Sequence, residues 1–159
     1  IEKLVFADNT FDFVYSSLAI HYIKNWTKVF KEVKRVLKSK SYFLFSCEHP
    51  IMGSLEWTVN NDIEKSRQLS IHTDKLSKKV TIFGDYLSRR LNVDVWGENT
   101  VDIWHKSIGE IVGEIKSAGL LVESFVEPRP TRAMQKIAPN TYEKLMKIPS
   151  FMIFRLFKQ

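Results

Sequence analysis

The sequence predicts an α/β fold, and three consecutive segments indicate it. Phe11–Ile20 is nearly continuous in apolar character and rich in β-forming residues, as is typical of a strand buried on both faces. Trp26–Leu37 then places its apolar side chains at helical spacing. Tyr42–Cys47 is a second strand of the buried type. A strand, a helix and a strand with short links form a βαβ unit, so the two strands are expected to be parallel.

The rest of the chain predicts further strands and helices. Pro50–Lys79 is polar and irregular, and Val80–Trp96 and Val101–Trp104 are expected to form short β segments. Ser107 and Glu110 have the spacing of a capping box, which opens a helix with Ile108, Ile111, Val112 and Ile115 on one face and Gly119 at its end. Three more elements complete the prediction: a strand at Leu120–Glu127, a helix from Pro139 to about Lys147, and a strand at Phe151–Phe157. The two strands are expected to pair antiparallel, with Phe151, Phe154 and Phe157 in the core.

Composition narrows the class of protein. The 159 residues suffice for one domain with a real core, and no apolar run approaches the roughly 20 residues that span a bilayer. The single Cys47 predicts a reducing, cytoplasmic environment, and no signal peptide is visible. The net charge of +6 is dispersed along the chain, which favours a solvated surface over a nucleic-acid interface. The His, Cys and acidic residues show no metal-ligand spacing, and no metal is expected.

Several stretches in this order resemble one known family. Leu4-Val-Phe-Ala-Asp-Asn-Thr-Phe-Asp-Phe-Val is similar to the family's stretch before its fourth strand, and Phe30-Lys-Glu-Val-Lys-Arg-Val-Leu-Lys38 to the helix that follows. Tyr42-Phe-Leu-Phe-Ser-Cys-Glu-His-Pro50 resembles the fifth strand and its loop. The C-terminal part of the chain is similar to the tail of the small-molecule branch of this family, at His105, Ala118-Gly-Leu120, Glu127-Pro128 and Pro149–Lys158. The chain thus resembles a class I S-adenosylmethionine-dependent methyltransferase of the type 11-like group.

The resemblance implies a Rossmann-like doubly wound sheet, of which residues 1–159 form a single partial domain. They would be the C-terminal half, with strands 4, 5, 7 and 6 of the family order, and residues 50–105 would be an inserted substrate lid. The family's Gly-x-Gly-x-Gly loop would precede Ile1. Ser39-Lys40 stands where the family has a glycine turn, so a positive φ there would carry a steric cost.

By resemblance, a bound S-adenosyl-L-methionine would lie near the carboxyl end of the strand at Phe11–Ile20. Cofactor contacts are then expected from Ile1, Glu2, Ser16, Ser17, Leu18 and Ala19. His21 is a candidate general base, with a capping or surface role as its alternative. Tyr22, Glu48, His49 and His105 are candidate contacts for the acceptor, although structural roles for both histidines remain open.

The predicted function is methyl transfer to a small molecule, with the 159 residues alone inactive. The alternative is a non-catalytic fragment that acts as a dimerisation or interaction module. Without the first half of the fold, the strand at Phe11–Ile20 would be an unpaired edge, and soluble proteins cover such edges. A homodimer or a retained N-terminal fragment is therefore expected as a partner, besides the small-molecule acceptor.

Overall fold

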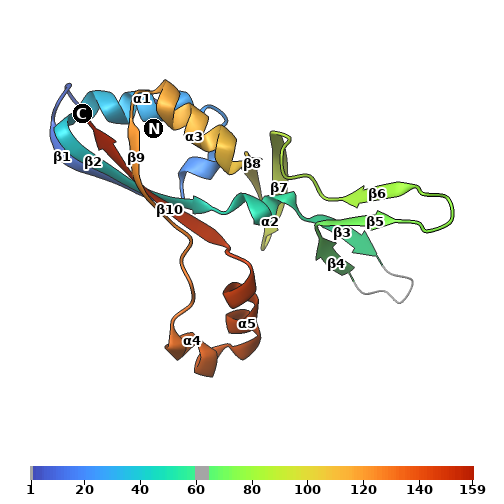
Figure 1. Ribbon diagram of the computed structural model, residues 1–159. Helices are drawn as coiled ribbons and strands as arrows, with labels where there is room; N and C mark the ends of the chain where they lie inside the picture. The colour runs from blue at the N-terminus through green and yellow to red at the C-terminus, as the bar shows by residue number, and fades with distance from the viewer. Residues whose placement is uncertain (1, 60–64) are drawn as a thin grey trace.

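The computed structural model describes residues 2–59 and 65–159, and a mixed sheet forms its centre (Figure 1). Its strands are β1 (Phe11–Ser17), β2 (Leu37–Glu48), β9 (Leu121–Val126) and β10 (Phe151–Lys158). Their order is β1-β2-β10-β9, with β1 parallel to β2 and the two later pairs antiparallel. This confirms the predicted α/β fold, its sheet order and the antiparallel pairing of the last two strands.

Two helices pack on one face of this sheet, α1 (Trp26–Val36) and α3 (Ile108–Ser117). Alternate residues of β2 and β10 meet them, which gives each strand one fully buried side. The side chains of this core are Val29, Phe30, Val33, Phe43, Phe45, Ile111, Ile115, Met152, Phe154 and Leu156. Asn25 and Ser107 cap the two helices by accepting the N–H groups of Lys28 and Glu110.

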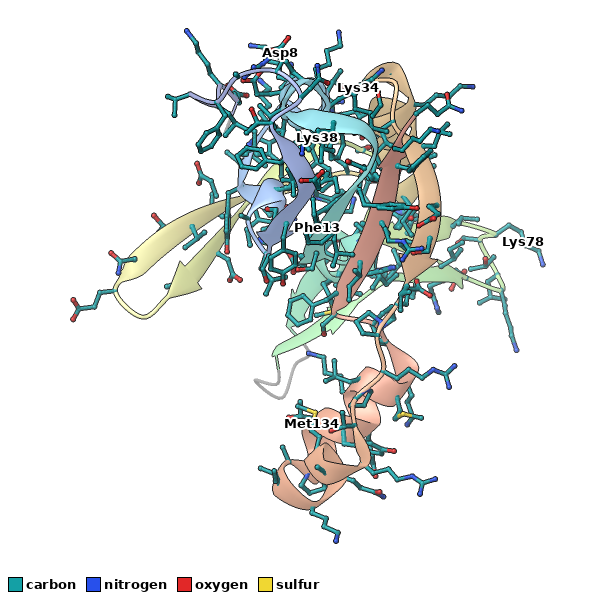
Figure 2. All side chains as sticks on the ribbon, turned by 90° about the vertical axis from the view of Figure 1, so that its left-hand side faces the viewer. Asp8, Phe13, Lys34, Lys38, Lys78 and Met134 are labelled. Carbon is teal, nitrogen blue, oxygen red and sulfur yellow. The ribbon has the colours of Figure 1, made fainter. Side chains whose placement is uncertain are left out.

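The prediction for the first strand was wrong in two respects. β1 ends at Ser17, because Leu18 has a φ of 48° and Ile20–Tyr22 turn into the short 3₁₀ helix η1. β1 is also not buried on both faces: Phe13 is 52% exposed and Tyr15 60% exposed. Figure 2 faces this edge of the sheet, with Phe13 labelled on it. The apolar pattern of this strand predicts that both of its faces are covered by other elements. In the described residues only one face is covered.

β2 begins earlier than predicted, since Lys38–Ser41 belong to the strand and do not merely close the helix. The pairing with β1 shifts here, from Phe11 opposite Leu37 to Phe13 opposite Tyr42. Lys40 lies in this irregular stretch and has a φ of 62°, as expected where the family has a glycine turn. A left-handed conformation costs a residue with a Cβ roughly 1–2 kcal/mol.

The capping box is only half formed: Ser107 accepts the N–H of Glu110, but the Glu110 carboxylate pairs with Arg89. Three side chains lie differently from the predicted core, namely Val112, Phe151 and Phe157. Val112 is exposed on α3. On β10 only Phe154 of the predicted aromatic run is fully buried, whereas Phe151 is 44% exposed. Phe151 and Phe157 stand an odd number of positions from Phe154, so the alternation of a strand sends them to the opposite face.

Between β2 and α3, leaving aside residues 60–64, the structure describes a short helix and three antiparallel strand pairs that extend away from the sheet (Figure 1). This region contains α2 (Pro50–Ser54), β3 (Glu56–Val59), β4 (Lys65–Gln68), β5 (Ser70–Thr73), β6 (Val80–Phe83), β7 (Arg90–Trp96) and β8 (Asn99–His105). The pairs are β3 with β4, β5 with β6 and β7 with β8. The β segments predicted at 80–96 and 101–104 are thus confirmed.

The chain between β9 and β10 forms α4 (Arg132–Ile137) and α5 (Pro139–Lys147), which project from the same end of the sheet as the insertion, because Phe151 at the start of β10 pairs with Glu48 at the end of β2 (Figure 1). Pro139 occupies the first turn of α5, as predicted. Among the described helices, none has the length and apolar character needed to cross a membrane.

Candidate functional site

The carboxyl ends of the parallel strands β1 and β2 form one rim of the sheet. At this rim Leu18 leaves β1 in a left-handed conformation. Its N–H donates to the carbonyl of Ser46 at 3.0 Å and lies 3.2 Å from the hydroxyl of the same residue. The hydroxyls of Ser17 and Ser46 are 3.5 Å apart. Strained backbone held by neighbouring bonds is a feature of ligand sites, so Leu18 marks this rim as a candidate site.

His21 and Tyr22 follow on η1 and meet the end of β2. The Nδ1 of His21 accepts the backbone N–H of Glu48 at 3.2 Å, and the His21 ring lies edge-on to that of Tyr22 at 4.2 Å. Burial lowers the pKa of His21 to about 4, so its imidazole is neutral near pH 7. Burial and the charge of Glu48 both raise the pKa of Tyr22. The structure therefore brings together His21, Tyr22 and Glu48, three of the residues predicted for the site.

His49 lies behind this rim in a structural arrangement. Its Nδ1 accepts the N–H of Ile51 at the start of α2, at 3.1 Å, which leaves the ring proton on Nε2. Nε2 donates to the carboxylate of Glu127 at 2.8 Å. Burial lowers the pKa of His49, although Glu127 opposes the shift. His49 thus joins the ends of β2, α2 and β9.

His105 ends β8 and is only 3% exposed. Its Nε2 donates to the carbonyl of Tyr86 at 3.0 Å, so Nδ1 is the unprotonated ring nitrogen. Within the described residues this Nδ1 has no hydrogen-bond partner. It faces Gly53, where a Cβ would stand 2.9 Å from it. Burial lowers the pKa of His105.

Of the other predicted cofactor contacts, only Ala19 lies next to Leu18 at this rim. Ile1 lies outside the described residues. Glu2 is exposed, and the segment after it is fixed near the far end of β1, because Leu4 donates its N–H to Glu32 and Arg35 donates to the Leu4 carbonyl. Ser16 borders an apolar hollow at the outer edge of β1, whereas Ala19 is half-buried beside η1.

A hollow of about 490 Å³ lies where β2 and α2 meet the β7–β8 hairpin. Glu48 borders it from the rim, and the insertion supplies Gly53, Asp85, Arg90 and Asn92. Sequence reasoning missed these four residues as members of a site. No local spacing places them beside α2, because the bonds from Arg90 and Asn92 to the Gly53 carbonyl span 37 and 39 positions along the chain.

The described residues contain no group of three or more His, Cys, Asp or Glu side chains placed to hold a metal ion.

Comparison with known proteins agrees with this fold. Residues 1–45 match a family described as "Methyltransferase domain". A sequence relative is an uncharacterized protein of Haemophilus influenzae, 26% identical over 129 residues, which cover 80% of this chain and 47% of the relative. The chain thus spans about half the length of that protein.

Two solved structures share the fold. One is an S-adenosylmethionine-dependent methyltransferase from Mesorhizobium loti, with a TM-score of 0.73 and 24% identity, over 98% of this chain and 65% of that one. The other is a candidate S-adenosylmethionine-dependent methyltransferase from Listeria monocytogenes, with a TM-score of 0.66 and 22% identity, over 99% of this chain and 66% of that one. The resemblance recognised in the sequence is confirmed at the level of the fold: the chain has the fold of these S-adenosylmethionine-dependent methyltransferases, and residues 1–45 match the methyltransferase family.

Proposed function

We propose that this chain forms the acceptor side of an enzyme that methylates a small molecule with S-adenosyl-L-methionine. The observation that carries the proposal is the convergence of His21, Tyr22 and Glu48 at the carboxyl ends of β1 and β2, next to the 490 Å³ hollow. Ligands of doubly wound sheets bind outside these strand ends. The insertion over residues 50–105 would act as the substrate lid, because it supplies most of the hollow's wall.

The rim residues fit the cofactor by position and chemistry. Ser17, Leu18 and Ala19 would hold its methionine part, with the exposed Leu18 side chain against apolar atoms and Ser17 offering a hydroxyl. When bound, the cofactor would supply a methyl group on a positively charged sulfur. The glycine-rich loop of the family has no counterpart among these residues, so we propose that another segment supplies it and that the 159 residues alone are inactive.

His21 would act as general base only after a local rearrangement. Its Nδ1 already accepts the Glu48 N–H, which places the proton of the neutral ring on Nε2. Taking up a proton therefore requires the bond to Glu48 to break. In the arrangement seen here, His21 positions the end of β2, and Tyr22 and Glu48 would face the acceptor together with the insertion.

Methyl transfer tests the proposal directly. The protein from the complete reading frame around this sequence is incubated with S-adenosyl-L-methionine labelled in the methyl group and with a small-molecule library. Label in a small product, lost in a Tyr22→Ala variant that keeps its fold by circular dichroism, is the expected result. Absence of cofactor binding by the complete protein would refute the proposal. Transfer confined to nucleic acid would refute its substrate class.

An interaction module is the second candidate, favoured by the exposure of Phe13 and Tyr15 on the edge strand β1. It predicts a stable partner on this edge and no methyl transfer by the complete protein, so the same assay separates the two functions.

We also propose a cytoplasmic location, from the single thiol of Cys47.

A further inference from the structure

The hollow beside the rim differs in charge from the rest of the chain. The whole sequence has a net charge of +6, but four carboxylates border the hollow, namely those of Glu48, Glu56, Asp85 and Asp94. Their only cationic counterpart among the described lining residues is Arg90. Apolar walls complete the hollow, from Leu55, Leu91, Val93 and Ile103.

Arg90 is committed to holding the hollow together. Its guanidinium donates to the Gly53 carbonyl at 2.5 Å, to the Asp85 carbonyl at 2.6 Å and to the Asn92 side-chain oxygen at 3.2 Å. These bonds join α2, the segment before β7, and β7 itself. An incoming anion would have to compete with all three acceptors, so Arg90 is a poor receptor for a carboxylate or phosphate.

A buried acceptor atom lies behind the same wall. Gly53, Asn92 and Ile103 border both the large hollow and a recess of about 20 Å³ that is also lined by His105. The unprotonated Nδ1 of His105 points at Gly53 and has no partner within the described part of the chain. A buried nitrogen of this kind is stabilised by a hydrogen-bond donor and not by another acceptor.

We propose that this hollow binds a cationic, amphipathic small molecule, with an ammonium group on the carboxylate side and an apolar body on the Leu55, Leu91 and Val93 side. The inference rests on the proposed function in identifying this ligand as the methyl acceptor. Removal of the ammonium from water is offset by several carboxylates at once, and an anion of the same shape is repelled. The acidic lining therefore sets the substrate class.

Binding of three matched probes to the purified chain tests the inference without any methyl transfer. The probes are phenethylamine, the neutral 2-phenylethanol and the anionic 3-phenylpropionate, compared by ligand-detected NMR titration. Phenethylamine is expected to bind most tightly and 3-phenylpropionate least. The double variant Glu56→Gln with Asp85→Asn should weaken phenethylamine binding about tenfold, since two partly exposed charge contacts are removed.

The variants keep the backbone contacts of the residues they replace. Glu56 accepts the N–H of Gly84, and Asp85 accepts those of Leu87 and Ser88, through oxygens that Gln and Asn retain. The matched control is Asp74→Asn, because Asp74 accepts the N–H groups of Leu76 and Ser77 in the same way but does not line the hollow. It should bind phenethylamine like the parent chain.

Equal binding of all three probes, preference for the anion, or an equal loss in the Asp74→Asn control would overturn the inference. The proposed function fails separately, by loss of cofactor binding in the complete protein. If that protein transfers methyl groups only to neutral or anionic acceptors, the function stands and this inference is wrong.

Discussion

Replacement of Glu114 by Gln should destabilise the fold more than any other single loss of charge on α3. The Glu114 carboxylate accepts one hydrogen bond from the Lys106 ammonium, at 2.6 Å, and another from the backbone N–H of Thr27, at 2.7 Å. It also forms an ion pair with Arg89 at 3.1 Å. The Lys106 side chain is 0% exposed, and its nitrogen lies 5.0 Å from the centre of the Trp26 ring. Glu114 thus neutralises a cation inside the core and binds the first turn of α1.

The magnitude follows from the burial of Lys106. Gln keeps an oxygen for Thr27 but removes the carboxylate that is hydrogen-bonded to the ammonium, and breaking a buried ion pair typically costs about 3–5 kcal/mol. We expect roughly 3 kcal/mol, which lowers the melting temperature by about 6–12 °C in a chain of this size. Thermal unfolding followed by circular dichroism measures the change.

Two further variants isolate the cause. Glu110→Gln removes the other carboxylate that pairs with Arg89, in a more exposed position. It should therefore cost less than about 1 kcal/mol. The double variant Lys106→Met with Glu114→Gln removes both charges, and most of the lost stability should return. If Glu114→Gln costs no more than Glu110→Gln, Glu114 does not neutralise a buried cation and the reasoning is wrong.

Four other outcomes are expected. The pKa of His21 falls from 6.5 to about 4 on folding, so the stability it contributes is complete above pH 6.5 and is lost as the pH falls toward 4. The free energy of unfolding, measured by urea titration at each pH, should drop by up to about 3 kcal/mol across this window, and by less in His21→Gln. Gly53→Ala should lower the melting temperature, because the new Cβ would stand 2.9 Å from His105 Nδ1, whereas Gly113→Ala, with open space around it, should raise stability by up to about 1 kcal/mol. Light scattering should find the purified chain associated through β1, and Tyr15→Lys should shift it toward the monomer; an 18.6 kDa monomer with a bare β1 would contradict this. Calorimetry should find weak or no binding of S-adenosyl-L-methionine by the 159 residues, and a micromolar dissociation constant would show that they suffice.

The central sheet could be predicted because its information is local. The helix at Trp26–Val36 repeats its apolar residues at the helical period, and the strand at Phe11–Ser17 has β-forming residues throughout. The spacing between Ser107 and Glu110 predicts the start of α3. Each of these signals depends on neighbours within a few positions, which any packing partner leaves unchanged.

Exposure could not be predicted in the same way. The pattern around Phe13 and Tyr15 describes which surroundings would suit the strand, but whether a neighbour is present depends on other segments. Part of the candidate site could not be predicted for the same reason, because it depends on contacts between distant segments. His21, Tyr22 and Glu48 follow strand ends and could be proposed from topology, whereas Arg90 was missed because its role arises only where the β7–β8 hairpin folds back on α2.

Two adjacent arginines explain how the insertion is held over the sheet. Arg89 bonds the carboxylates of Glu110 and Glu114 on α3, and Arg90 bonds the Gly53 carbonyl on α2. In an extended segment successive side chains point to opposite sides, so one short stretch reaches both elements. Any movement of the β7–β8 hairpin that opens the hollow must break one of these attachments. We therefore place the fixed base of the proposed lid at the start of β7, between α2 and α3.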